Sequence, residues 1–219
     1  DNQLNKLIPL RKKHENFQNP NYHLLSKIKT FFNTNRVFVN NTFVLNNITK
    51  YLHEHNLLPA ICFVFSRRKA EQFAKTITLS LNDSKTMNII RKECKQILIS
   101  KLTNWKEYIE LPEFEELTLL LQKGIAVHHS GIIPIFKEII EILFEKGYVK
   151  LLFATETFAV GVNMPAKTVI FSGIKKFDGQ HFRFLLPHEY TQMAGRAGRR
   201  GIDKKGVVIH LNNMFDLPP

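Results

Sequence analysis

Apolar residues along this chain fall into two alternating patterns, short continuous runs and runs at helical spacing. Largely apolar runs of strand length occupy residues 60–65, 125–127, 149–154, 168–171 and 206–211. Such runs are typical of strands that are buried on both faces of a parallel sheet. Because segments with helical spacing lie between them, the sequence predicts an α/β fold with a doubly wound parallel sheet and flanking helices.

The predicted helices begin and end at residues with known capping roles. Ser66 precedes a predicted helix at residues 67–81, and a serine hydroxyl accepts a hydrogen bond from the first turn. Pro134 suits the first turn of another helix, and Gly147 suits its end. A last helix is predicted over residues 188–199, before the final strand.

The chain divides into two parts. Residues 1–45 hold basic patches and many asparagines, and we predict a linker or inter-lobe segment there with a short helix near residues 22–32. Residues 46–219 are predicted to form the domain. Within it, residues 82–122 are polar with a helical period, which predicts a variable helical segment interrupted at Pro112.

Composition narrows the class of protein. The 219 residues are 44% hydrophobic and 23% charged, which is globular, and the formal net charge is +12. A strongly basic domain favours a nucleic-acid partner, although a basic surface that only confers solubility is the alternative. No apolar run reaches membrane-spanning length, so no membrane association is expected. Cys62 and Cys94 have no metal-ligand spacing, so we expect no disulfide or metal site and a reducing intracellular compartment, the nucleus or the cytoplasm.

Residues 192–201, QMAGRAGRRG, carry the strongest chemical signal. On the predicted helix Arg196 and Arg199 project from one face, and the glycines beside them allow another surface to approach. Two guanidiniums placed in this way suit a phosphate whose charge shifts during transfer, the arginine-finger role. Gln192, one turn earlier, is placed to orient water or the terminal phosphate. The alternative is a basic turn that only touches nucleic acid.

Four segments in order resemble the motifs of superfamily 2 helicases. They are residues 63–68 (motif IV), 128–131 (the segment after it), 154–166 (motif V) and 192–201 (motif VI). Residues 176–179 resemble the Ski2-like and Mtr4-like branch of DExH-box RNA helicases. The resemblance covers about residues 57–211 and implies the C-terminal RecA-like lobe of a two-lobe helicase core.

This resemblance assigns roles to residues. It implies RNA-backbone contacts by Arg67, His129, Ser130, Gly131 and Thr155. It implies nucleotide contacts by Gly161, Asn163, Gln192, Arg196 and Arg199, the last three being catalytic. Other roles stay open: Thr155 as a helix cap, His128 as a structural residue, and Glu156 as either a coupling residue or a solvated carboxylate. A metal site at His128 and His129 is rejected, because no further ligands stand at matching spacing.

Missing motifs limit what the chain does alone. It has no GKS or GKT phosphate loop and no DExH or DExD, so ATP and Mg²⁺ would be held mainly by an N-terminal RecA-like lobe. The chain begins with Asp rather than Met, which suggests a fragment of a longer protein. We expect the isolated chain to fold, to bind RNA weakly and to show no ATP turnover.

The position of the two arginines is the critical expectation. In doubly wound sheets the working residues lie at the carboxyl ends of strands, and all candidate motifs are expected there. Arg196 and Arg199 should therefore face that edge, outside internal ion pairs, and the interpretation as a helicase lobe is expected to fail if they do not.

The main prediction is a lobe of an ATP-dependent RNA helicase that acts in an RNA-decay or RNA-processing complex. Three other functions are weighed against it. One is a non-catalytic RNA-binding module, and another is a DNA-directed superfamily 2 helicase. A Rossmann dinucleotide enzyme is excluded, because no GxGxxG follows the first strand.

Overall fold

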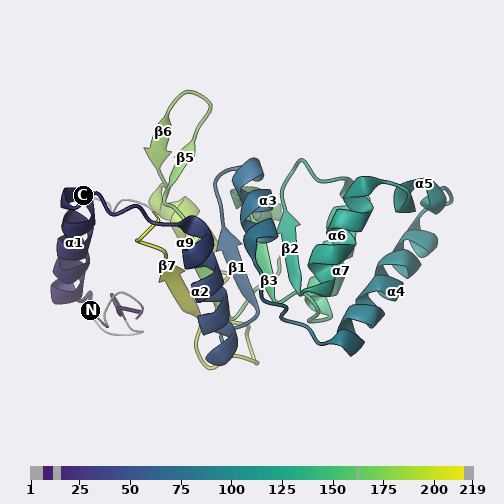
Figure 1. The fold of residues 1–219 in the computed structure, drawn as a ribbon, viewed down its shortest axis with the longest axis horizontal. Helices are drawn as coiled ribbons and strands as arrows, with labels where there is room; N and C mark the ends of the chain where they lie inside the picture. The colour runs from purple at the N-terminus through teal and green to yellow at the C-terminus, as the bar shows by residue number, and fades with distance from the viewer. Residues whose placement is uncertain (1–6, 12–15, 162, 215–219) are drawn as a thin grey trace.

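The computed structural model of the chain describes residues 7–11, 16–161 and 163–214. Its centre is a sheet in the order β2-β3-β1-β4-β7, in which all neighbouring strands are parallel (Figure 1). The strands are β1 (Ala60–Phe63), β2 (Ile125–His128), β3 (Leu151–Ala154), β4 (Thr168–Phe171) and β7 (Val207–His210). The predicted doubly wound α/β fold is confirmed.

The carboxyl ends of the five strands form one straight row. Phe63 at the end of β1 lies opposite Ala154 and Phe171, the last residues of β3 and β4. Ala154 lies opposite His128, and Phe171 opposite His210. The sheet therefore has two well-defined edges, a carboxyl edge and an amino edge, and loops that leave neighbouring strands meet at one edge.

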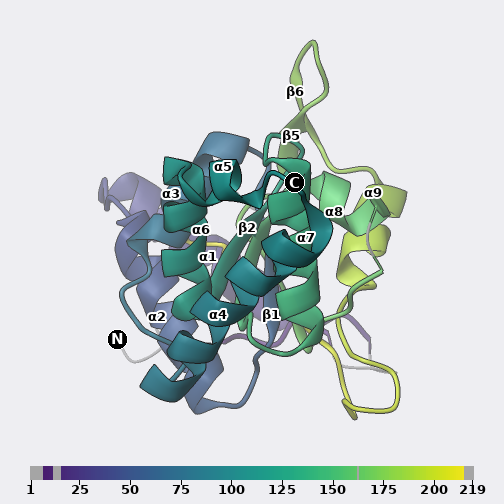
Figure 2. The same ribbon diagram turned by 90° about the vertical axis from the view of Figure 1, so that its right-hand side faces the viewer.

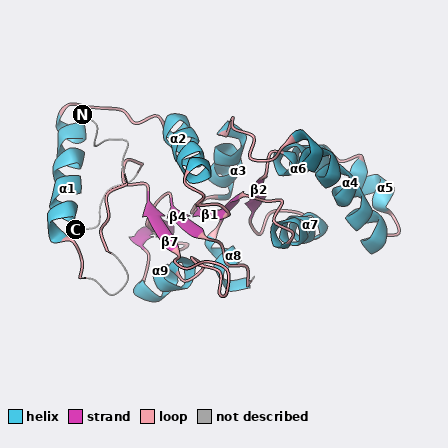
Figure 3. Cartoon of the chain, turned by 90° about the horizontal axis from the view of Figure 1, so that it is seen from below, coloured by secondary structure: helices cyan, strands magenta, loops and turns pink. Residues whose placement is uncertain are grey.

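Helices cover both faces of the sheet (Figure 3). On one face lie α2 (Asn41–Glu54) and α3 (Arg67–Thr76). On the other lie α7 (Pro134–Glu145), α8 (Glu156–Gly161) and α9 (Pro187–Ala194). Each face carries its own cluster of buried apolar side chains, which accounts for the apolar character of the strands on both sides.

Helix α2 runs across the predicted junction between linker and domain. Asn40 caps its first turn, and Val44 and Leu45 are buried in the cluster that α2 shares with the sheet. The division at residues 45 and 46 stays a prediction. Ahead of α2, the predicted short helix is present as α1 (Asn19–Thr34), and none of its residues is buried.

The predicted helical segment at residues 82–122 comprises α4 (Ser84–Lys101), α5 (Trp105–Ile109) and α6 (Pro112–Gln122) (Figure 2). Pro112 begins α6, a position where proline costs no hydrogen bond. The helix predicted at residues 67–81 is shorter, because α3 ends at Thr76. No helix among the described residues is long and apolar enough to cross a membrane.

One element was not predicted. β5 (Lys175–Phe177) and β6 (Phe182–Phe184) form a separate antiparallel hairpin that extends beyond the carboxyl edge of the main sheet (Figure 1). Its side chains are exposed or half-buried, so the sequence shows no buried apolar run there. Gly179, with φ +106°, lies in its turn, a conformation that glycine adopts without strain.

Candidate functional site: two edges of one sheet

The residues proposed to hold RNA gather at the carboxyl edge. Arg67 follows β1, residues 129–131 follow β2, and Thr155 follows β3. The backbone N–H of Thr155 donates to the carbonyl of His128, 3.2 Å away. A Cβ added to Gly131 would lie 3.6 Å from Cδ of Arg67. The fold therefore brings these three segments together, as the strand-end rule predicts.

Both imidazoles of this edge are engaged within the protein. Nε2 of His128 lies 2.8 Å from a carboxylate oxygen of Glu141, and Nε2 of His129 lies 2.9 Å from Glu71. Both rings are almost fully buried. Burial lowers the pKa of His128, with Glu141 opposing that shift. This geometry matches the structural role considered for His128. The His129 side chain is likewise buried and bound to a carboxylate of this chain.

The loop after β2 offers a narrower set of contacts than its sequence suggests. Nδ1 of His129 accepts the backbone N–H of Gly131 at 3.1 Å, so that N–H already has a partner. Ser130 and Gly131 are exposed, as is Arg67 nearby. Contacts to a phosphate here would come mainly from Ser130 of this loop and from Arg67 at the start of α3. The RNA-binding assignment of residues 129–131 stays a prediction.

Thr155 stands between β3 and α8. Its carbonyl accepts the N–H of Phe158, and its hydroxyl lies 3.0 Å from the hydroxyl of Thr157. The residue is buried, so only a partner that reaches into this corner would contact it. Capping and phosphate contact remain compatible, because the hydroxyl retains donor and acceptor capacity.

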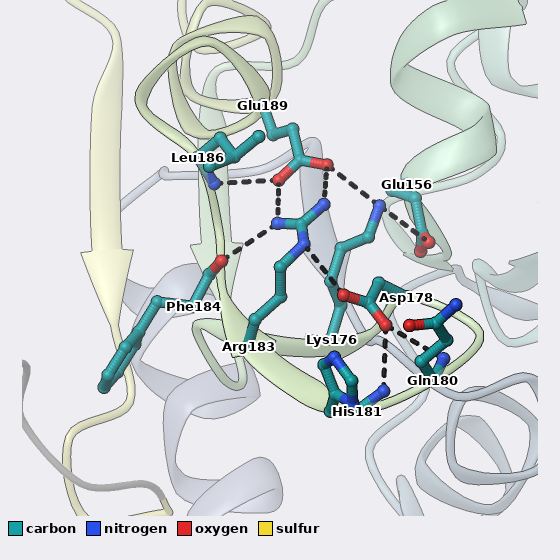
Figure 4. A network of polar contacts seen from close by, with 9 residues as sticks. All are labelled: Glu156, Lys176, Asp178, Gln180, His181, Arg183, Phe184, Leu186 and Glu189. Atoms are coloured by element: carbon teal, nitrogen blue, oxygen red, sulfur yellow. Dashed lines mark hydrogen bonds and ion pairs between the residues drawn. The ribbon is translucent and has the colours of Figure 1, made fainter.

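A network of charged side chains anchors the base of the hairpin to α8 and α9 (Figure 4). Glu189 of α9 accepts hydrogen bonds from Nη1 and Nη2 of Arg183 at 2.8 and 2.9 Å, from Nζ of Lys176 at 3.0 Å and from the N–H of Leu186 at 2.8 Å. Lys176 also pairs with Glu156 at 3.6 Å. The Arg183 guanidinium, more than the other donors, holds the pKa of Glu189 far below its usual range.

The outer part of the hairpin is aromatic and open. The rings of Phe177 and Phe182 lie 5.4 Å apart, and their residues are 52% and 75% exposed. At the base of the hairpin, Nζ of Lys175 lies 4.7 Å from the ring centroid of Phe184. Phe177 is therefore exposed and does not pack in the core.

Helix α9 ends earlier than predicted. It spans Pro187–Ala194, and Gly195 follows as its C-terminal cap, so the prediction of a helix through residue 199 is wrong. Gln192 is exposed in the last turn. Arg196 and Arg199 lie in the turns beyond, and the expectation that they share one helix face is also wrong.

Backbone contacts explain why the helix stops. The N–H of Ala166 donates to the carbonyl of Arg196 at 2.9 Å, and the N–H of Gly198 donates to the carbonyl of Ala166 at 2.7 Å. Gly198 has φ +91°, outside the helical region. A Cβ added to Gly206 would lie 2.4 Å from the carbonyl oxygen of Ala197. The chain is thus pinned to the residues just before β4 and β7.

These contacts place both arginines at the amino edge. Ala166 precedes β4, and Gly206 precedes β7, so residues 196–199 lie at the end of the sheet opposite Thr155. The expectation that every candidate motif lies at the carboxyl edge is therefore wrong for Arg196 and Arg199. The physical reason is direction: α9 starts near the carboxyl edge and runs antiparallel to the strands, so its end reaches the other edge.

Arg196 joins motif VI to motif V. Its Nη1 donates to Oδ1 of Asn163 at 2.9 Å, and its Nη2 donates to the carbonyl of Ala159 within α8. Both acceptors are uncharged, so the arginine keeps its net positive charge in this corner. Gly161 lies beside them, and a Cβ there would meet nothing within 4 Å. Of the proposed nucleotide contacts, Asn163 and Arg196 are thus brought into direct contact.

Arg199 is held by an acidic partner that the sequence analysis missed. Asp203 accepts Nε of Arg199 at 2.7 Å and Nη2 at 2.9 Å. The expectation that Arg199 would stand outside internal ion pairs is wrong. The guanidinium lowers the pKa of Asp203 to about 2. The four-residue spacing of Arg199 and Asp203 was visible in the sequence. Whether the two side chains meet depends on the turn between them, which only the fold reveals.

A groove of about 1030 Å³ lies along the amino edge. Asn163 lines it together with five cations and the carboxylate Glu145; the cations are Lys150, Lys167, Arg196, Arg199 and Arg200. Lys150 and Lys167 were not singled out from the sequence, because isolated lysines before strands carry no motif. The electrostatics and the amide suit a polyanion such as a nucleotide phosphate.

Comparison with known proteins identifies the family. Residues 83–201 match the helicase conserved C-terminal domain model, which is more than half of the chain. The antiviral helicase SKI2 of Saccharomyces cerevisiae is 49% identical over 163 residues, which are 74% of this chain and 12% of SKI2. The exosome RNA helicase MTR4 of Homo sapiens is 47% identical over 163 residues, 74% of this chain and 15% of MTR4.

The chain belongs to the helicase conserved C-terminal domain family. Its parallel sheet is that of a RecA-like lobe, as the motif resemblance implied. The chain spans about an eighth to a seventh of the length of the two relatives named.

Proposed function

We propose that this chain is the second RecA-like lobe of an ATP-dependent RNA helicase of the Ski2-like and Mtr4-like kind. The observation that carries the proposal is the separation of two polar sites on opposite edges of one sheet, with Arg196 and Arg199 at the amino edge and Arg67, Ser130 and Thr155 at the carboxyl edge. Similarity to SKI2 and MTR4 supports the choice of RNA over DNA as substrate.

At the amino edge, Arg196 and Arg199 would contact the terminal phosphates of ATP held by an N-terminal lobe. Their charge would stabilise the transition state, a contribution worth about 10³ to 10⁵ in rate where it has been measured in related chemistry. Asn163 would complete this wall, and Gln192 and Gly161, which are not among the residues that line the groove, would contact the nucleotide from beside it. The donor set of the groove suits phosphate oxygens rather than a metal cation, so Mg²⁺ would be held by the other lobe, where it neutralises charge on the phosphates.

At the carboxyl edge, Arg67, Ser130 and Thr155 would contact successive RNA phosphates. Such binding is salt-sensitive and carries little sequence preference, because phosphates are the same at every position. His129 would act by shaping the loop, since its imidazole binds Glu71 and the N–H of Gly131. Movement of the two lobes during ATP turnover would shift this grip along the strand.

The cellular setting follows from the relatives and the cysteines. SKI2 is named as an antiviral helicase and human MTR4 as an exosome RNA helicase, which supports a role in an RNA-decay complex. Cys62 and Cys94 are free and buried, and burial raises the pKa of both thiols. Two unpaired thiols support a reducing compartment, the nucleus or the cytoplasm.

The test uses the full-length protein that contains this chain. Arg196→Ala and Arg199→Ala are each expected to lower RNA-stimulated ATP turnover by about 10³-fold, because each removes a guanidinium from the transition state. RNA affinity, measured by fluorescence anisotropy without nucleotide, is expected to stay within about twofold, because the RNA site lies at the other edge. Arg91→Ala on α4 provides a control with the same charge change.

Unchanged ATP turnover in both arginine variants would show that the amino edge is not part of a nucleotide site. Paired RNA and DNA duplexes of one sequence then decide the substrate: faster unwinding of the DNA duplex would assign a DNA-directed helicase instead.

A further inference from the structure

Asp203 and Arg199 form an unusually complete pair. Oδ2 of Asp203 accepts both the side-chain Nε–H of Arg199 at 2.7 Å and its backbone N–H at 3.0 Å, while Oδ1 accepts Nη2 at 2.9 Å. The Asp203 side chain is only 5% exposed, whereas that of Arg199 is 28% exposed. The carboxylate thus fixes the arginine at its backbone and at one side of its fork.

The pair leaves the opposite side of the guanidinium available. Arginine carries five N–H donors in a planar fork, and Asp203 takes two of them, Nε–H and one on Nη2. The other three donors have no hydrogen-bond acceptor among the residues that the structure describes. Arg199 lines the amino-edge groove, and Asp203 does not. The carboxylate therefore holds the fork from behind the groove.

We propose that Asp203 is a positioning residue that fixes the guanidinium of Arg199 in its phosphate-binding orientation before a nucleotide arrives. A long arginine side chain otherwise loses substantial rotamer entropy when it is ordered. Ordering it in advance moves that cost from the reaction to folding. The inference rests on the proposed arginine-finger function and adds a residue that acts through Arg199 rather than on the substrate.

The turn that carries the pair is itself built for this geometry. The N–H of Asp203 donates to the carbonyl of Arg199 at 2.9 Å, which closes a turn between the two residues and brings their side chains together. Gly201, inside this turn, has φ +75°, a conformation that a side chain would strain. The spacing between guanidinium and carboxylate is therefore fixed by the backbone as well as by the ion pair.

The experiment measures single-turnover ATP hydrolysis by the full-length protein at saturating RNA. Asp203→Asn leaves one acceptor oxygen and turns amide donors toward the guanidinium. Asp203→Glu keeps the charge but displaces the carboxylate by one methylene. Each is expected to lower the rate about 10- to 100-fold, since a misplacement of about 1 Å costs that much, while the KM for ATP stays within about threefold. Glu116→Gln, which breaks the surface pair with Lys75, is the control.

A double-mutant cycle separates positioning from a general structural role. Combined with Arg199→Ala, Asp203→Asn is expected to cause no further loss of rate, because the guanidinium that Asp203 positions is already absent. An equal loss in both backgrounds would overturn the proposal, as would an unchanged or faster rate in the Asp203 single variants. Thermal unfolding reports whether each variant is folded. If Asp203→Asn does not fold, the rate of Asp203→Glu alone tests the proposal.

The outcomes also distinguish failure of the positioning role from failure of the arginine-finger function on which it rests. If Arg199→Ala lowers turnover and the Asp203 variants do not, only the positioning role fails. If Arg199→Ala itself leaves turnover unchanged, the arginine-finger function fails, and the positioning role fails with it.

Discussion

The two edges of the sheet hold their polar groups in different ways. At the carboxyl edge, residues 129–131 and Thr155 directly follow strands whose register is fixed, so the ends of the strands decide where these residues lie. At the amino edge, Arg196 and Arg199 lie far from any strand end in sequence, and backbone contacts with the residues before β4 and β7 hold them.

This difference has a consequence for side-chain chemistry. The imidazoles of the carboxyl edge bind internal carboxylates, Glu141 and Glu71, which leaves hydroxyl and backbone groups to face a ligand. The guanidiniums of the amino edge also have internal partners, Asn163 and Asp203, yet both arginines still line an open groove. An internal ion pair therefore does not by itself remove an arginine from a site, because the fork has more donors than one carboxylate takes. The condition that the helicase interpretation fails unless both arginines face the carboxyl edge outside ion pairs is wrong, since the chain belongs to the helicase conserved C-terminal domain family with Arg199 paired and both arginines at the amino edge.

Among the changes that test how each edge is assembled, Gly206→Ala should have the largest effect, because it disturbs the backbone packing of the amino edge and leaves the carboxyl edge unchanged. The new Cβ would lie 2.4 Å from the carbonyl oxygen of Ala197 and 2.7 Å from the backbone N of Gly198, and neither backbone atom can swing aside. We expect RNA-stimulated ATP turnover of the full-length protein to fall at least 100-fold, because Arg196 and Arg199 move with this backbone.

The matched control for stability is Gly161→Ala, whose Cβ would meet open space. Thermal unfolding of the isolated chain should show a lower midpoint for Gly206→Ala and little change for Gly161→Ala. Equal midpoints and full turnover for Gly206→Ala would contradict the account of how the amino edge is assembled.

A smaller effect, confined to the carboxyl edge, is expected from Arg67→Ala. If Arg67 contacts one phosphate, RNA affinity should fall several-fold, and the slope of log affinity against log salt should become shallower by about 0.7. The measurement is a salt titration by fluorescence anisotropy with single-stranded RNA. Arg68→Ala removes the same charge from the next position of α3 and should leave the slope unchanged. Identical slopes for wild type and Arg67→Ala would exclude a phosphate contact.

The smallest effect concerns the imidazole of His210, at the carboxyl end of β7. Burial lowers its pKa, and its ring stacks on Phe171 at 5.3 Å and lies 3.2 Å from the hydroxyl of Tyr190. The unfolded chain therefore takes up a proton first as the pH falls below about 6.5, which favours unfolding. The stability contribution is present above that pH and is lost below it.

His210→Phe keeps a stacking ring and removes the titration. The free energy of unfolding of the isolated chain, from urea denaturation at pH 7 and pH 5, should fall less for this variant than for the wild type. The difference should be about 1.4 kcal/mol or less for each unit by which the pKa is lowered. His23→Phe, at an exposed position of α1, should behave as the wild type. A pH dependence that is the same in His210→Phe would assign it to other groups.

Local sequence patterns were sufficient to predict much of the fold and one of the two sites. The apolar runs predicted all five strands of the main sheet, since strands buried on both faces must be apolar throughout. The motif order predicted the family, and strand ends placed Arg67, Ser130 and Thr155 at one edge. Each of these inferences needs only neighbouring residues and the direction of a parallel strand.

Tertiary contacts decided the rest. Residues 195–199 look helical from local spacing, but hydrogen bonds to Ala166 and the close approach of Gly206 outweigh that preference and end α9 at Ala194. The base of the hairpin is anchored to α9 by the ion pair of Arg183 and Glu189, which meet only after folding. Local spacing describes what a segment prefers, whereas the edge that its side chains reach is set by long-range backbone contacts that no single segment contains.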